Sequence, residues 1–153
     1  MSDLPPESHR LDPDHHPTPF SAAQIRNASG AGTSVTFRID PPGEDAYLDR
    51  WEFLGGDDDG GLRRRWTETL EGDVIEPPSE MESAWLDLQQ HASYPCATTR
   101  IMTGSAATPA GEFECWIYVT TNDDGTVTKA SFARTEPGPP VLMETVADGE
   151  VLF

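Results

Sequence analysis

The stretch that most constrains the fold is residues 108–120, a tight turn followed by a long run of alternating side chains. Pro109 fixes its backbone φ angle and Gly111 accepts a positive φ angle, which together are typical of a turn. Beyond the turn, successive side chains point to opposite faces of a strand. One face is wholly apolar and is expected to meet a core: Phe113, Cys115, Ile117 and Val119. The other face is charged and then aromatic, and is expected to be partly in solvent: Glu112, Glu114, Trp116, Tyr118 and Thr120.

Turn residues and alternating patterns recur along the rest of the chain. The Asp124-Gly125 pair favours a tight hairpin, so residues 126–134 are predicted to return antiparallel to the first strand. Further strands are predicted at 33–40, 46–54, 62–70, 97–107, 141–146 and 151–153, with a short one at 74–75. Because short turns join most of these strands, the sheet is expected to be antiparallel.

Two segments have the pattern of helices. Residues 20–27 begin with Ser21 as a candidate N-cap and Gln24 three positions later, which is the spacing of a capping box. A longer helix is predicted from Ser79 to residue 92, with Glu82 completing a second capping box. Its apolar stripe consists of Met81, Trp85, Leu88 and Ala92.

These elements predict an α+β fold in which a curled antiparallel sheet, a half-barrel of seven or eight strands, wraps one amphipathic helix. Trp85 is then expected near the middle of the hollow. Residues 19–153 are predicted to form this single domain, with the helix at 20–27 leading into it. Residues 1–18 hold four prolines and three histidines with few apolar side chains, and they are predicted to be a disordered tail.

Charge limits the classes of partner. The 153 residues carry a formal net charge of −17, so nucleic acids and anionic membranes are expected to repel the chain. The acids concentrate in residues 41–90, which contain fourteen acidic residues against four arginines. No apolar run is long enough for a signal peptide or a membrane span, so we expect a cytoplasmic protein without membrane insertion.

A second signature lies in residues 97–147. The sequence Thr-Pro-Ala-Gly-x-Phe-x-Cys-Trp (108–116) is followed by a hairpin, by Phe-Ala-Arg (132–134) and by Pro-Gly-Pro-Pro-Val-Leu-Met-Glu (137–144). This arrangement resembles uncharacterised bacterial half-barrel domain families, which are similar in fold to lipoprotein carriers of the LolA and LolB type. The resemblance implies a curled sheet around a helix, with an apolar hollow that accepts acyl chains.

The sequence holds no recognisable catalytic, metal or cofactor motif. Cys96 and Cys115 are expected to be free thiols. The acids at 57–59 are adjacent, whereas calcium loops place acids at alternate positions. The basic triplet at 63–65 is interpreted as pairing across strands with Asp49 and Glu52, an anion contact being the alternative. Catalysis by Glu112 and Glu114 is not expected. An enzyme therefore ranks below the two functions described next.

Two functions remain open. The first is a non-catalytic binding module that holds an apolar or amphipathic small molecule in the hollow of the sheet. Its predicted lining is Phe37, Trp51, Trp66, Trp85, Phe113 and Ile117. These residues would equally well fill a core without leaving room for a ligand. The alternative is an acidic protein-interaction module that caps a basic partner.

Overall fold

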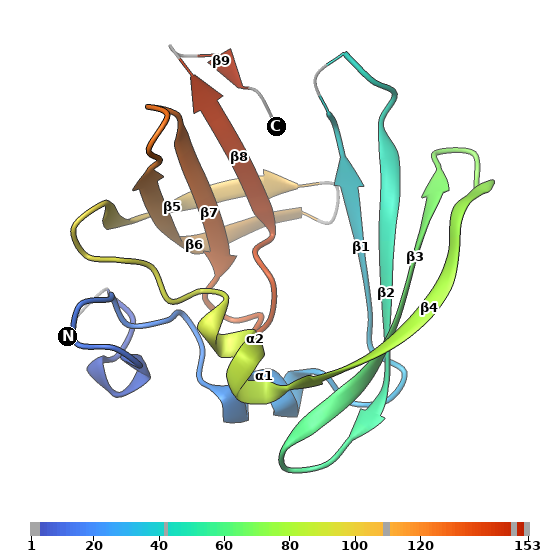
Figure 1. Cartoon of the computed structure of the whole chain (residues 1–153), viewed down its shortest axis with the longest axis horizontal. Helices are drawn as coiled ribbons and strands as arrows, with labels where there is room; N and C mark the ends of the chain where they lie inside the picture. Colours follow the sequence, from blue (N-terminus) through green and yellow to red (C-terminus); the bar gives the residue numbers. More distant parts are fainter. Residues whose placement is uncertain (1–3, 42, 109–110, 148–149, 152–153) are drawn as a thin grey trace.

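The computed structural model describes residues 4–41, 43–108, 111–147 and 150–151, and it contains two antiparallel sheets (Figure 1). The first sheet has the order β1 (Ser34–Ile39), β2 (Tyr47–Gly56), β3 (Gly60–Thr69) and β4 (Val74–Ala84). The second has the order β5 (Thr99–Thr108), β6 (Gly111–Thr121), β7 (Val127–Ala133), β8 (Leu142–Ala147) and β9 (Glu150–Val151). A 3₁₀ turn, η1 (Glu7–His9), and two short helices, α1 (Ala22–Ala28) and α2 (Trp85–Gln90), complete the described elements.

The mostly-β α+β class and the antiparallel pairing predicted from the sequence are confirmed. The single curled sheet is not found, because the strands divide into two sheets between β4 and β5. The connecting segment pairs with the N-terminal segment instead of continuing the first sheet: Cys96 N–H donates to the Asp14 carbonyl, and His15 forms a bridge with Pro95. Figure 1 shows the two sheets as separate walls with α1 and α2 at one end.

The helix predicted at 79–92 is wrong in its first half. Residues 74–84 form β4, and the helix α2 spans only Trp85–Gln90. Ser79 pairs with Arg65 and Ala84 pairs with Gly60, so β4 continues the ladder that β3 offers. The ladder hydrogen bonds outweigh the helix-capping signal at Ser79. Two prolines are tolerated in β4 because it is an edge strand.

The first predicted helix is confirmed with its cap. The Ser21 side chain accepts from Gln24 N–H, and the Gln24 side chain accepts from Ser21 N–H, which together make a capping box. The side chain of Gln89 in α2 accepts a hydrogen bond from Ala22 N–H at 2.9 Å. This bond ties the first turn of α1 to α2, so the two helices form one layer.

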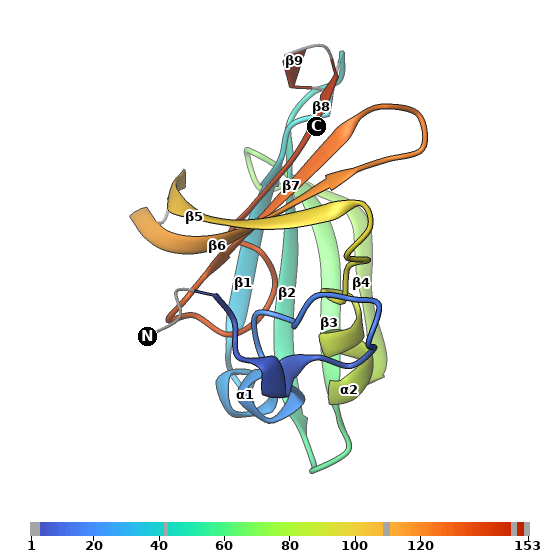
Figure 2. The same cartoon turned by 90° about the vertical axis from the view of Figure 1, so that its left-hand side faces the viewer.

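The N-terminal segment differs from the predicted disordered tail. Its described part packs on the second sheet and on α2, and Figure 2 shows it passing beside both helices. Buried His9 contacts the Thr18 carbonyl through Nδ1 at 3.0 Å, and the buried Tyr118 hydroxyl donates to the Pro17 carbonyl at 2.6 Å. Composition alone predicted disorder, but these side chains satisfy the segment's backbone groups.

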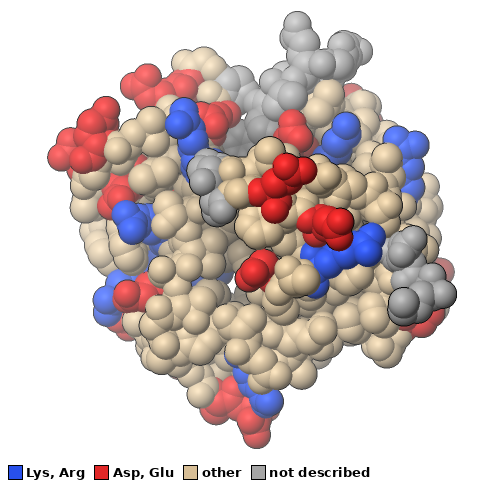
Figure 3. Space-filling view, turned by 180° about the vertical axis from the view of Figure 1, so that it is seen from behind, with Lys and Arg blue, Asp and Glu red and all other residues tan. Residues whose placement is uncertain are grey.

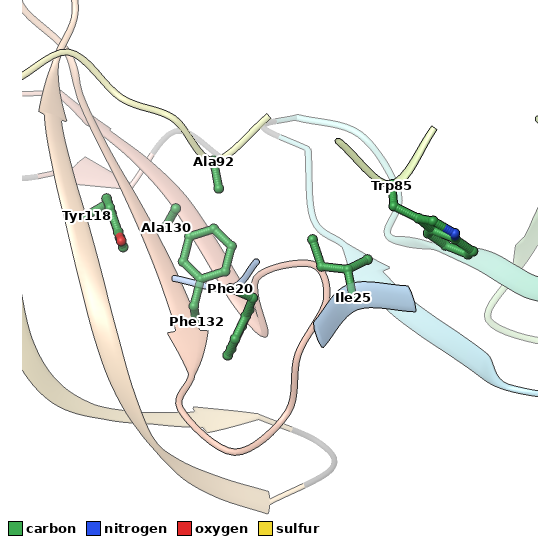
Figure 4. Packing of buried hydrophobic residues seen from close by; sticks show 7 residues of the cluster. All are labelled: Phe20, Ile25, Trp85, Ala92, Tyr118, Ala130 and Phe132. Atoms are coloured by element: carbon green, nitrogen blue, oxygen red, sulfur yellow. The ribbon is translucent and has the colours of Figure 1, made fainter. Parts of the chain in front are cut away.

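The core lies between the second sheet and the helices (Figure 4). Its rings meet edge to face, with centroids 5.5 Å apart for Tyr118 and Phe132 and 6.5 Å apart for Phe20 and Phe132. Tyr118 is 1% exposed, so the face of β6 that was expected to be partly wet is the one that meets this cluster. Cys115 on the other face is also fully buried, so both faces of β6 are covered at its centre.

Candidate functional site

The structure does not bring the six predicted lining residues into one hollow. Phe37 and Trp51 lie side by side on β1 and β2, with ring centroids 5.0 Å apart. Trp66 pairs with Arg50, whereas Trp51 pairs with Arg65, so the two tryptophans lie on opposite faces of the first sheet. Trp85 belongs to the core cluster. Phe113 and Ile117 lie on β6, on the opposite face from Tyr118, in the other sheet.

Trp85 has a structural role that its burial explains. It is 4% exposed, and its indole Nε1 donates to the Asp57 carbonyl at 2.8 Å. The ring covers Gly61, where an added Cβ would lie 2.4 Å from Cη2 of the indole. Trp85 therefore joins α2 to the β2–β3 hairpin, and Gly61 is required because a larger residue would collide with the ring.

Each face of the first sheet carries the same arrangement of tryptophan, carboxylate and arginine. On one face, Asp49 accepts from Trp51 Nε1 at 3.1 Å and from Arg65 at 2.9 and 2.8 Å. On the other face, Glu68 accepts from Trp66 Nε1 at 3.3 Å and from Arg50 at 2.7 Å.

In both arrangements the ion pair stabilises the charged form of a partner. Hydrogen bonding to Asp49 raises the pKa of Arg65, while hydrogen bonding to Arg50 lowers the pKa of Glu68. Arg64 bonds Glu52 and Glu80, so the predicted pairing of the basic triplet with Asp49 and Glu52 is confirmed for two of its three members.

Arg63 is the exception in the triplet. Its guanidinium carbon lies 4.3 Å from the centroid of the Trp51 ring, and its Nη2 reaches the Met81 sulfur. No described carboxylate lies within ion-pair distance of it, and its Nε is buried without a hydrogen-bond partner among the described residues. Burial lowers the pKa of Arg63, with the charge of Arg65 acting in the same direction. The charge of Asp49 opposes this shift in pKa without making an ion pair, so this face presents an aromatic pair beside a cation that contacts no described carboxylate.

Two small cavities lie in the described part of the chain. The larger, of about 210 Å³, lies between the N-terminal segment and Ile101, with Leu4, Pro6 and Arg10 in its wall. The smaller, of about 60 Å³, lies on the first sheet beside Trp66 and Glu76. Both are below the roughly 300–1,000 Å³ of a typical small-molecule site. Binding of an apolar ligand stays a prediction from the sequence.

The groups considered for metal binding or thiol chemistry have structural contacts. Both cysteines are free, as predicted. Among the residues that the structure describes, no group of three potential ligands could hold a metal ion. His15 contacts Ser93 and His16 contacts the Thr99 carbonyl, so these histidines fasten the N-terminal segment.

The Asp57 carboxylate accepts from two backbone N–H groups of its own loop, which lowers its pKa. No described helix is both long and apolar enough to cross a bilayer.

The most exposed part of the first sheet is the end formed by β4 and the turn before it. All of β4 except Ser83 is exposed, although the strand is eleven residues long. We call the following nine exposed side chains the β4 surface: Leu70, Glu71, Asp73, Val74, Ile75, Glu76, Glu80, Met81 and Glu82.

The β4 surface combines apolar and acidic side chains. Val74 is 59% exposed, Ile75 53% and Met81 43%. Residues 71–84 contain five acids and no base. Figure 3 shows acidic side chains along the left-hand border of the molecule, on the side of β3 and β4. This surface is hidden in the sequence because residues 79–84 have the pattern of a helix start, although the charge bias is visible.

Comparison with protein families, curated proteins and solved structures finds no match to this chain. Its function must therefore be inferred from its own residues.

Proposed function

We propose that the protein is an interaction module whose β4 surface binds a basic, partly apolar segment of another protein. The observation that carries this proposal is the composition of the β4 surface: large apolar side chains 43–59% exposed, interspersed with five acids, of which Glu80 is paired with Arg64 of β3. Exposed apolar side chains are typical of an interaction site, and the edge strand β4 presents them on both of its faces, with Met81 beside Arg63 and Val74 beside Glu68. The acids select a partner of opposite charge.

The charge of the whole chain supports the same partner. At a net charge of −17, the protein attracts cationic segments over several ångströms and repels anionic ones. Salt weakens this attraction, because the Debye length falls from about 10 Å at 0.1 M to about 3 Å at 1 M. The apolar contacts with Val74, Ile75 and Met81 are retained in salt, so binding is weakened but not abolished.

The test uses a synthetic peptide of alternating arginine and leucine residues, with affinity measured by calorimetry. The variant Glu76→Gln/Glu80→Gln/Glu82→Gln removes three charges from the β4 surface. The control Glu112→Gln/Asp123→Asn/Glu136→Gln removes three exposed acids elsewhere. We expect the first variant to bind roughly tenfold more weakly, at about 0.5 kcal/mol per charge. The control should bind like the wild type, apart from a small effect of net charge.

Two results would contradict the proposal. Equal losses in the two variants would show that only the net charge attracts the peptide. Binding that is unchanged by Val74→Ser/Ile75→Ser would show that the apolar side chains have no part in recognition. A peptide of alternating glutamate and leucine serves as the negative control, since like charges should prevent its binding.

A second candidate function is binding of an amphipathic anion on the face of the first sheet that carries Trp51, where Met81 of β4 also contacts Arg63. It is favoured by the neighbouring rings of Phe37 and Trp51 and by the guanidinium of Arg63, which has no carboxylate partner among the described residues. Native mass spectrometry tests it. An extra mass that is lost on denaturation and is absent from Arg63→Met would support the candidate. A bare wild-type mass, with no binding of added decanoate, would contradict it.

A further inference from the structure

The two sheets have four edges, and three of them carry features that discourage pairing with another chain. β4 contains Pro77 and Pro78, which cannot donate to a ladder, together with three glutamates. β9 has two residues, too few for a stable pairing. β1 has six residues and carries Arg38, whose charge discourages an apolar edge contact. Short strands, charge and proline are the devices by which natural sheets avoid aggregation.

The fourth edge, β5, shares one of these devices, a single arginine, but it is ten residues long and has no proline. It spans Thr99–Thr108 without a proline or an acidic residue, and Arg100 is its one charged side chain. Its central residues from Met102 to Ser105 are all exposed, Met102 by 45%. On one side it pairs with β6 over its full length, and no described strand pairs on the other side. A long, exposed edge of this kind is a template for another strand.

The described part of the N-terminal segment lies at the start of this edge, where it bonds Thr99 and lines a cavity with Ile101. His16 contacts the Thr99 carbonyl through Nε2 at 2.6 Å, which fixes the segment at the first residue of β5. Figure 2 shows β5 crossing the front of the molecule. The exposed centre of β5 therefore lies beyond the contact at Thr99.

The distribution of charge indicates what can approach β5. Two copies of a chain with a net charge of −17 repel one another over most of their surfaces. Residues 88–111 contain no acid, and β5 lies in this stretch. A second copy can therefore approach along β5 without placing carboxylates in opposition. The basic partner proposed for the β4 surface is not attracted to β5, because this strand carries one arginine and no acid.

We propose that two copies of the chain associate through β5, which pairs antiparallel with itself about a two-fold axis near Thr103 and Gly104. Such an interface is self-complementary, as cyclic dimers require. The axis is perpendicular to the sheets, so the two second sheets join into one continuous sheet. The two Arg100 residues then lie on the order of 20 Å apart along the strands, at about 3.4 Å per residue, so they do not repel each other strongly.

The dimer is expected to be weak and reversible, because pairing two strand edges buries less than the standard interface area. Sedimentation velocity across roughly a hundredfold range of concentration should show a monomer converting to a dimer. Added salt should strengthen the dimer, because it screens the repulsion between the two acidic copies. Salt weakens the proposed binding at the β4 surface, so the two interactions are distinguished by opposite salt dependence.

The decisive variant is Thr103→Glu, which places one new carboxylate from each copy beside the axis. Its matched control is Thr36→Glu, the same change at an exposed position of β1. We expect Thr103→Glu to weaken the dimer by tenfold or more, roughly 1.4 kcal/mol, and the control to leave it nearly unchanged. Hydrogen exchange gives a readout without substitution: within residues 100–107, the alternate amides that point away from β6 should exchange more slowly at high concentration.

Three results would overturn the proposal. The first is a monomer at every concentration in high salt. The second is a dimer that Thr103→Glu and Thr36→Glu weaken equally. The third is a dimer whose formation slows exchange in β1 or β4 and leaves β5 unchanged. Circular dichroism and urea unfolding establish that both variants are folded.

Discussion

Arg63 and Trp51 lie on adjacent strands with the guanidinium carbon 4.3 Å from the centre of the indole ring, on a face where Asp49 already binds Arg65. The two arginines are separated by one residue on the same strand and differ in their partners. Arg65 makes a bidentate ion pair, whereas Arg63 has a ring and a sulfur atom beside it. Replacement of Arg65 should therefore cost more stability than replacement of Arg63.

Arg63→Met should leave the stability within about 1 kcal/mol of wild type, because it keeps an unbranched side chain on Trp51 and removes a desolvated charge. Arg65→Met should destabilise by about 1–3 kcal/mol, because Asp49 is 6% exposed and would lose its ion partner. Urea unfolding of both variants measures the difference. Equal losses would show that Arg63 has a partner of comparable strength.

Gly61→Ala should destabilise the protein by about 1–3 kcal/mol, because the added Cβ would lie 2.4 Å from the Trp85 ring. Gly30→Ala is the matched control, since nothing lies within 4 Å of its added Cβ. The free energy of unfolding of both variants is the measurement. A neutral Gly61→Ala would mean that Trp85 does not cover the β2–β3 hairpin.

The stability should fall when the pH rises above about 10. Burial raises the pKa of the Tyr118 hydroxyl above its ordinary value of 10.0, and burial also raises the pKa of Tyr94. In this range the unfolded chain loses the tyrosine proton while the folded chain keeps it, so alkali favours unfolding.

Tyr118→Phe tests this assignment. At neutral pH it should cost about 1–2 kcal/mol, because the Pro17 carbonyl loses its donor. Above pH 10 the variant should lose stability less steeply than the wild type, with a residual slope from Tyr94. Urea unfolding from neutral pH to about pH 11 gives both quantities. If the free energy of unfolding falls with pH equally in the variant and the wild type, groups other than Tyr118 cause the loss of stability in alkali.

The strands were predictable because alternation of side chains is a local signal. The strand after the turn at Gly111, the strand of Val35, Phe37 and Ile39, and the first helix with its Ser21 cap all appear where the sequence predicts them. The cross-strand pairs of Arg65 with Asp49 and Arg64 with Glu52 followed from the spacing of opposite charges. In each case the deciding residues are neighbours in sequence or lie on consecutive strands.

The errors arise where a distant contact decides the structure. Ser79 and Glu82 have the spacing of a helix cap, but the segment forms ladder hydrogen bonds with β3 and becomes part of β4. The composition of residues 1–18 indicates disorder, but the Tyr118 hydroxyl and the Gln89 amide bond the segment's backbone carbonyls. The sheet register places Trp51 and Trp66 on opposite faces, which the spacing within each strand does not show.

Part of the candidate site could be found in the sequence. Residues 71–84 carry five acids and no base, which is visible without a structure. The exposure of Val74, Ile75 and Met81 could not be predicted from the sequence. It depends on β4 being an edge strand with both faces uncovered.

The most direct test of the proposed function is to map the binding of the arginine–leucine peptide on the backbone amides by NMR titration. We predict saturable shifts concentrated at the residues of the β4 surface, from Leu70 to Glu82. Shifts spread over all acidic regions, including the loop at Asp57–Asp59, would contradict the proposal, because they would show attraction by net charge without a defined surface.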